Sequence, residues 1–154
     1  MIGGGWRVLS VPFRKVRRMA GQRFRCTPGG VCWLRLHLVW YPKYRRRVLG
    51  GWVARRLDER IVQIADEHGW QIVAHEVMPD HMHLFVQVGP SDSPAAVVRA
   101  FNGRTARVVR AEFPYVRWLA TVLWSPSYFA ASVGYVSKTT VRGYIEHQSD
   151  AAAA

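Results

Sequence analysis

Cysteine is scarce in this chain, because only Cys26 and Cys32 occur among 154 residues. Two thiols are too few for a disulfide framework, and their spacing to each other and to the histidines is not that of a metal site. The chain also lacks an apolar run of about 18 residues, the length that a membrane-spanning helix needs. Arginines occupy the N-terminal positions where a signal peptide would have its apolar stretch. We therefore expect a reduced, cytoplasmic protein that is neither secreted nor membrane-spanning.

Acidic residues are absent from the first third of the chain. Residues 1–57 contain 14 Lys and Arg and no Asp or Glu, whereas the rest of the chain contains 8 basic and 10 acidic residues. Most of the basic residues are arginines, whose planar guanidinium pairs bidentately with phosphate. A one-sided basic region attracts a polyanion by releasing its condensed counterions. The charge pattern therefore predicts a nucleic-acid partner, with an Arg-rich codon bias on a solvated surface as the alternative.

Length and composition indicate one folded domain. The chain has a mass of 17.6 kDa, with 49% hydrophobic and 21% charged residues, which is typical of globular proteins. Residues 1–30 mix glycine, proline and basic residues without periodicity. We interpret them as a basic, partly disordered N-terminal arm that precedes a single domain at 31–150. The alternative is an extension that results from start-site choice.

Beyond the arm, strand and helix patterns alternate. We expect strands at 32–41, 71–77, 81–88 and 128–133, and helices at 52–68, 94–113 and 137–148. Gly69 ends the first helix, Ser93 caps the second, and a loop with Trp118 and Pro126 leads to the last strand. This order predicts an α+β fold, a ferredoxin-like (RRM-like) split βαβ sheet with two helices on one face and an added C-terminal helix.

Two histidines alternate with a methionine at the start of the third expected strand. His81 and His83 therefore project from one face, roughly 7 Å apart, while Met82 projects into the core. Two neutral imidazoles at this spacing can bind one divalent metal ion. The alternative is a pair of partly exposed strand histidines without a ligand. His37 lies on the polar face of the first strand, either near this site or as an ordinary hydrogen-bonded histidine.

Tyr144 and Gln148 lie four residues apart on the last expected helix. They share one face of that helix, beside Val141 and Ile145, which would dock it onto the domain. Taken alone, Tyr144 is more typical of a docked aromatic residue with its hydroxyl at the rim, and Gln148 is typical of a surface residue.

Several motifs together resemble the IS200/IS605-type single-tyrosine HUH transposases. The segments HLVWYPKYRRRVL, EVMPDHMHLFVQV, FPY, LWSPSYF and YIEHQ occur in the order of that family, over about residues 22–148. The resemblance implies that His81 and His83 bind a divalent metal, that Gln148 supplies a third ligand, and that Tyr144 is the nucleophile. Mg²⁺ or Mn²⁺ would suit such ligands. The motif does not fix the role of Glu76. It is either a carboxylate near the site or an ordinary charged residue at the end of a strand.

The resemblance implies a DNA transposase that binds single-stranded, hairpin-bearing ends and cleaves and rejoins them through a 5′-phosphotyrosine. A homodimer in the prokaryotic cytoplasm, associated with the nucleoid, would carry out the reaction. A phenol with a pKa of about 10 is a poor nucleophile at neutral pH, so a metal that polarises the phosphodiester fits this chemistry. One alternative is a domesticated relative that processes chromosomal repeats, and another is a noncatalytic module that binds single strands.

Basic and aromatic residues are interleaved at the end of the first strand and in the turn that follows it. Trp40, Tyr41 and Tyr44 could stack on unpaired bases, and the neighbouring cations could bind phosphates. The predicted DNA contacts here are Lys43, Tyr44, Arg45, Arg46 and Arg47. Arginines also form a basic face on the second helix, where we predict contacts from Arg104 and Arg107. The alternative is that all of these are solvated surface neighbours.

Overall fold

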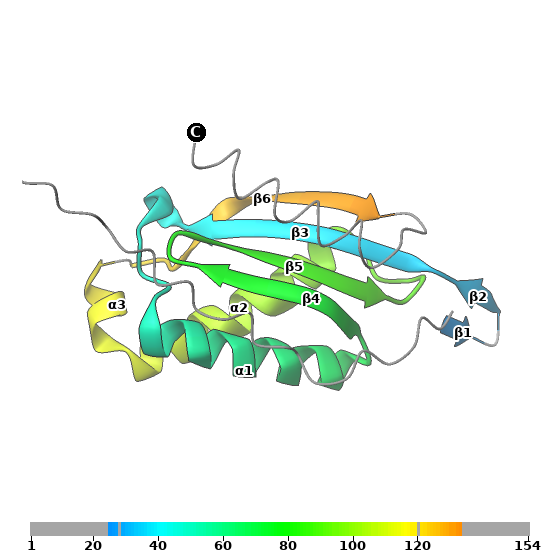
Figure 1. The fold of residues 1–154 in the computed structure, drawn as a ribbon, viewed down its shortest axis with the longest axis horizontal. Coiled ribbons are helices and arrows are strands. Elements are labelled where there is room, and N and C mark those ends of the chain that lie inside the picture. Colours follow the sequence, from blue (N-terminus) through cyan, green and yellow to red (C-terminus); the bar gives the residue numbers. More distant parts are fainter. Residues whose placement is uncertain (1–24, 28, 120, 134–154) are drawn as a thin grey trace, which may run out of the picture.

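A four-stranded antiparallel sheet organises the fold. The computed structural model describes residues 25–27, 29–119 and 121–133. The strand order is β4-β5-β3-β6, comprising β3 (Leu34–Pro42), β4 (Gln71–Met78), β5 (His81–Val88) and β6 (Trp124–Val133) (Figure 1). Helix α1 (Gly51–His68) connects β3 to β4, and α2 (Pro94–Glu112) lies between β5 and β6. Each βαβ unit encloses a strand of the other unit, which is the split arrangement that the sequence predicts.

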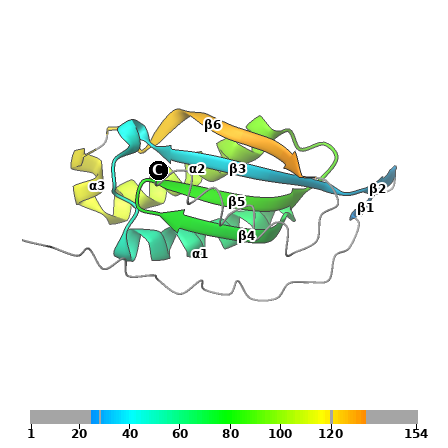
Figure 2. The ribbon, with the colours of Figure 1, turned by 45° about the horizontal axis from the view of Figure 1, so that its top comes forward.

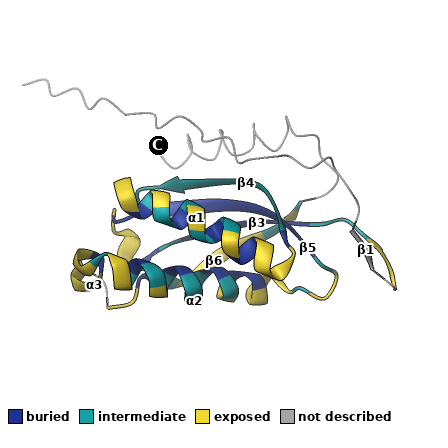
Figure 3. Ribbon diagram, turned by 90° about the horizontal axis from the view of Figure 1, so that it is seen from below, coloured by how far each residue is buried: buried dark blue, intermediate teal, exposed yellow. Residues whose placement is uncertain are grey.

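Both long helices lie on one face of the sheet, and their ends have local causes. Figure 3 shows α1 and α2 side by side, with their buried residues turned towards the strands. Helix α1 ends where Gly69 adopts a left-handed conformation with φ of 67°, which glycine adopts without steric cost. Helix α2 begins after Ser93, whose side chain accepts a hydrogen bond from the backbone N–H of Ala96. The first two of the three predicted helices are therefore confirmed.

The hydrophobic core fills the layer between sheet and helices. Alternate residues of β3 and β5 face this layer, and α1 contributes apolar residues spaced three or four positions apart. The largest fully buried side chains include Trp40, Phe101, Leu38, Leu57 and Ile61. Burial of this apolar face fixes the register of β5, and so decides which side chains of β5 lie on the opposite face.

The segment before the last strand differs from the expected loop. Residues Pro114–Leu119 form helix α3, and β6 begins at Trp124, four residues earlier than expected. A proline that ends one helix is also well suited to the first position of the next. Its fixed φ is helical, and a backbone N–H at that position would have no acceptor within the helix, so its absence costs nothing. Pro126 is tolerated within β6 because that strand lies at the edge of the sheet.

The first strand of the sheet also corrects an expectation. Its alternation predicts one apolar and one polar face, but two residues of the expected polar face are buried, with His37 0% and Arg35 7% exposed. Because β3 runs between β5 and β6 (Figure 2), side chains of both neighbouring strands pack against His37. His37 stacks on Phe85, and the Arg35 side chain donates a hydrogen bond to Gln87.

A small hairpin precedes the sheet, formed by β1 (Arg25–Thr27) and β2 (Gly30–Cys32). Its first strand falls inside the predicted N-terminal arm, whose residues 1–24 lie outside the described residues, so the division at residue 30 stays a prediction. The predicted last helix at 137–148 also lies outside them. No helix in the described ranges is long and apolar enough to cross a membrane.

Candidate active site

His81 and His83 lie together on the face of the sheet opposite α1 and α2. They are the first and third residues of β5, whose residues are all buried, and they are 9% and 4% exposed. Their ring centroids are 5.0 Å apart and the ring planes are at 81° to each other. The intervening Met82 is part of the core. The structure thus places the two predicted metal ligands side by side, as the strand period requires.

Each of these histidines has a protein partner at Nδ1. His81 Nδ1 is 2.7 Å from a carboxylate oxygen of Asp80, and His83 Nδ1 is 3.2 Å from Nε2 of His37. Metal-binding histidines commonly have such a partner on one nitrogen while the other nitrogen binds the ion. In both rings this leaves Nε2 as the nitrogen for a ligand.

Burial lowers the pKa values of two histidines at this site, His83 and His37. Desolvation, followed by the neighbouring His81 and His37, lowers the pKa of His83 to about 4. Desolvation alone lowers the pKa of His37 to about 4. Both rings are therefore neutral at pH 7, the form in which imidazole binds a metal. For Asp80, burial raises the pKa, but the hydrogen bond and charge of His81 outweigh it, and the net shift is downward.

The residues present fit a divalent metal as two of its ligands. Two imidazoles whose Nδ1 atoms have protein partners form a suitable donor pair. Within residues 25–27, 29–119 and 121–133, no three His, Cys, Asp or Glu side chains form a group that could hold a metal ion. The predicted third ligand Gln148 and the predicted nucleophile Tyr144 lie outside the described residues. Glu76 lies opposite His83 on β4.

A strained basic turn follows β3. It contains a short 3-10 helix, η1 (Lys43–Arg45), in which Tyr44 and Arg45 have φ of 63° and 49°. Such left-handed conformations cost non-glycine residues about 1–3 kcal/mol each and persist only where the surrounding structure holds them. The backbone N–H of Lys43 donates a 2.8 Å hydrogen bond to the carbonyl of Leu123, which fixes the start of this turn.

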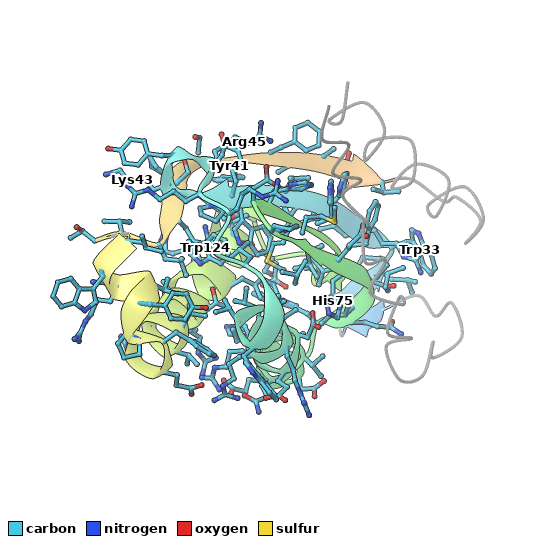
Figure 4. The ribbon with its side chains drawn as sticks, turned by 60° about the vertical axis from the view of Figure 1, so that its left-hand side comes forward. Trp33, Tyr41, Lys43, Arg45, His75 and Trp124 are labelled. Atoms are coloured by element: carbon cyan, nitrogen blue, oxygen red, sulfur yellow. The ribbon has the colours of Figure 1, made fainter. Side chains whose placement is uncertain are left out.

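Aromatic and cationic side chains gather at this turn. Lys43 and Arg46 lie over the ring of Tyr44, with distances of 5.4 and 5.6 Å to its centroid, and Arg45 lies over Tyr41 at 5.3 Å. A shallow pocket of about 140 Å³ opens here, lined by Lys43, Tyr44, Arg46, Leu119, Thr121 and Val122. Figure 4 shows Tyr41, Lys43 and Arg45 together at one end of the sheet, with Trp33 at the other. Lys43, Tyr44, Arg45 and Arg46 therefore lie together on one surface.

The basic turn and the histidine pair lie at the same end of the sheet. Arg45 is close enough to Asp80 to lower the pKa of that carboxyl group, and the backbone N–H of Leu49 donates to the carbonyl of Pro79. Arg104 and Arg107 are not part of this surface. They lie on α2, in the helix layer, where Arg104 forms an ion pair with Glu67 of α1. Their predicted DNA contacts would belong to a second surface and stay predictions.

Sequence reasoning did not identify Asp80 and left the place of His37 open. Asp80 could have been found from the sequence, because it is a carboxylate that directly precedes the first histidine, His81. His37 carries no comparable signal, because it is 46 residues from His83 and approaches it only through the pairing of β3 with β5.

Comparisons with known proteins identify the family of the chain. The family model of IS200-like transposases matches residues 31–148. The ISDra2 transposase TnpA of Deinococcus radiodurans is 36% identical over 79% of this chain and 89% of its own length. The transposase for insertion sequence element IS200 of Salmonella typhimurium is 23% identical over 73% of this chain and 74% of its own length.

Solved structures share the fold. The 1.90 Å crystal structure of a candidate transposase from Deinococcus radiodurans R1 is 35% identical, has a TM-score of 0.67, and covers 80% of this chain and 97% of its own. A REP-associated tyrosine transposase bound to a REP hairpin has a TM-score of 0.53 at 17% identity, covering 84% of this chain and 68% of its own. Because the family model spans most of the chain and a curated relative exceeds one third identity, the chain belongs to the IS200-like transposase family, of the IS200/IS605 type.

Proposed function

We propose that this transposase cleaves and rejoins single-stranded DNA at hairpin-bearing ends through a covalent 5′-phosphotyrosine on Tyr144. The observation that carries the proposal is the buried pair His81 and His83, in which both Nδ1 atoms have protein partners. Gln148 would complete the metal site, which we propose takes Mg²⁺ or Mn²⁺. When bound, the metal would act as a Lewis acid that polarises the scissile phosphodiester.

The bond changes balance without a nucleotide cofactor. The phenol oxygen of Tyr144 forms a bond to phosphorus, the bond from phosphorus to the 3′ oxygen breaks, and the proton lost by the phenol is matched by the one gained by the released 3′ hydroxyl. Because the phosphodiester energy is kept in the phosphotyrosine, a 3′ hydroxyl can attack it in turn and rejoin strands. His81 and His83 would hold the metal, and the lowered pKa of His83 keeps a nitrogen lone pair of that ring available at pH 7.

The basic turn supports binding of a single strand near this site. Its cations can neutralise phosphates and its tyrosines can stack on bases, and it lies at the same end of the sheet as the histidines. A structural neighbour with this fold was solved with a REP hairpin bound, so the fold can present a surface to a hairpin. We propose a homodimer as the active form.

Trapping the covalent intermediate tests the function. Wild-type protein incubated with labelled single strands of its own element ends and Mg²⁺ should form an adduct that resists denaturant, and peptide mapping should place it on Tyr144. Tyr144→Phe should abolish both the adduct and cleavage. Hairpin binding should stay nearly unchanged, because the substitution removes one hydroxyl group and leaves the phosphate contacts in place.

The matched control is Tyr128→Phe, the same change at an exposed tyrosine of β6, which should cleave like wild type. Wild-type cleavage by Tyr144→Phe would refute the assignment. Binding without any adduct in the wild-type protein would instead favour a noncatalytic single-strand binding module.

A further inference from the structure

His37 is a buried histidine that has no role in the proposed reaction. It lies on β3 with 0% exposure, and its Nε2 is 3.2 Å from Nδ1 of His83. The two rings are nearly parallel, at 17°, but their centroids are 5.4 Å apart, much farther than the two nitrogens. The rings therefore meet edge to edge. This is the geometry of an N–H···N hydrogen bond, not of a face-to-face stack.

Two phenylalanines hold the His37 ring in this orientation. Phe85 of β5 lies flat against it, with centroids 4.3 Å apart and planes at 8°, and Phe129 of β6 meets it edge-on at 5.8 Å. These contacts come from the strands on both sides of β3, so the ring cannot rotate without disturbing both neighbours. The Nε2 atom of His37 is thus kept against His83.

We propose that His37 is a positioning residue, which accepts a hydrogen bond from Nδ1–H of His83 and so fixes the tautomer in which Nε2 of His83 binds the metal. A neutral imidazole carries one ring proton, and a proton held at Nδ1 leaves the lone pair on Nε2. His81 has the carboxylate of Asp80 in the equivalent place. The two ligands are therefore oriented by different acceptors. This inference rests on the proposed metal site at His81 and His83.

The test compares two replacements of His37 in the full-length protein. His37→Phe keeps a flat ring against Phe85 but removes the acceptor, whereas His37→Gln offers an amide oxygen in its place. Titration calorimetry with Mn²⁺ should show a roughly 10- to 100-fold weaker affinity for His37→Phe, the usual loss when such a partner is removed. His37→Gln should recover most of that loss. Hairpin binding without metal should be unchanged in both variants.

His75→Gln is the matched control. His75 is also a strand histidine with a mostly buried side chain and a hydrogen bond to a protein partner, Asp58, but it has no contact with His81 or His83. Its replacement should leave Mn²⁺ affinity unchanged. Wild-type Mn²⁺ affinity in His37→Phe would overturn the inference. Absence of Mn²⁺ binding in wild type, or unchanged binding in His81→Ala, would instead overturn the metal site itself.

A measurement on the wild-type protein does not depend on how the variants fold. Long-range ¹H–¹⁵N spectra of the protein loaded with diamagnetic Zn²⁺ report which ring nitrogen of each histidine carries the proton. We expect both His83 and His37 to be protonated at Nδ1. A proton on Nε2 of His37 would make His37 the donor and would refute the proposed tautomer.

Discussion

Thr105 joins the last strand to the helix layer through one hydroxyl group. Its Oγ1 donates a 2.7 Å hydrogen bond to the carbonyl of Phe101 and accepts a 2.9 Å hydrogen bond from Nε1 of Trp124. Thr105 and Trp124 are 0% and 4% exposed. Because the indole N–H is a donor that water reaches poorly here, the hydroxyl acceptor is needed to offset its desolvation.

Thr105→Val should therefore destabilise the protein by about 1–3 kcal/mol, the cost of leaving a buried donor without its acceptor. The side chain keeps its shape, so packing changes little. Thr105→Ser, which keeps the hydroxyl and loses one methyl group, should cost about 1 kcal/mol. Urea unfolding monitored by tryptophan fluorescence measures both values. Equal stability of Thr105→Val and wild type would show that the hydroxyl contributes nothing.

At the scale of elements, α1 and α2 are joined by an ion pair at the protein surface. Nε and Nη2 of Arg56 donate to the two carboxylate oxygens of Glu112 at 2.7 and 2.8 Å. This bidentate geometry is the favourable one for an arginine and a carboxylate. The hydrogen bond from Arg56 lowers the pKa of Glu112 below its usual value.

Glu112→Gln should lower the free energy of unfolding at pH 7 by about 0.5–1 kcal/mol, a value limited by solvent exposure of both side chains. A carboxyl group whose pKa is depressed on folding stabilises the protein above its unfolded pKa of about 4.3, and this contribution is lost as the pH falls through the folded pKa. The difference between variant and wild type should therefore vanish at acid pH in urea titrations. A difference that persists at a pH where Glu112 is protonated in the folded protein would exclude the ion pair as its cause.

The basic turn is a second element with its own prediction. Arg45→Ala or Arg47→Ala should each reduce the slope of log K against log salt for single-stranded DNA by about one unit, if each side chain neutralises one phosphate. Arg60→Ala on α1 is the control, because Arg60 donates to Gln63 within its own helix. Binding isotherms at several salt concentrations give the slope. An unchanged slope in both turn variants would place the phosphate contacts elsewhere.

At the scale of the whole molecule, the predicted nucleophile is far along the chain from the histidine pair. Between them lie α2, α3 and β6, and the predicted last helix follows β6 after a short segment. Such a terminal helix can dock on its own sheet or cross to a partner. We predict that Tyr144 of one subunit works with His81 and His83 of the other in at least one state, and that Gln148 accompanies Tyr144 because they share a helix face.

Mixed dimers of His81→Ala and Tyr144→Phe subunits test this arrangement. A shared site would place both defects in one active site and none in the other, so cleavage should return to about half of the wild-type level. Docking within each chain would put one defect in every site. The measurement is cleavage of labelled single-stranded ends by coexpressed, doubly tagged heterodimers, with each homodimeric variant as control. Activity no higher than these controls would reject the shared site and leave the chemistry standing.

Local pattern was sufficient for much of the fold. Alternation defined the hairpin of β4 and β5, Gly69 and Ser93 marked helix ends, and the strand period put His81 and His83 on one face. These features depend on residues within one or two turns of each other, so they can be recognised without knowing what packs against them. Helix α3 was missed because Pro114 was interpreted only as the end of the preceding helix, whereas a proline is also suited to the first position of a new one.

The tertiary structure alone decided which distant residues meet at the site. The contact between His37 and His83 depends on the register of β3 against β5, which burial of the opposite, core-facing side chains sets. The left-handed backbone of Tyr44 and Arg45 likewise depends on its link to Leu123 across the sheet end. The sequence by itself predicted that His81 and His83 share one face of β5. What surrounds that pair was decided by packing, because a strand pattern specifies a face but not the neighbours on that face.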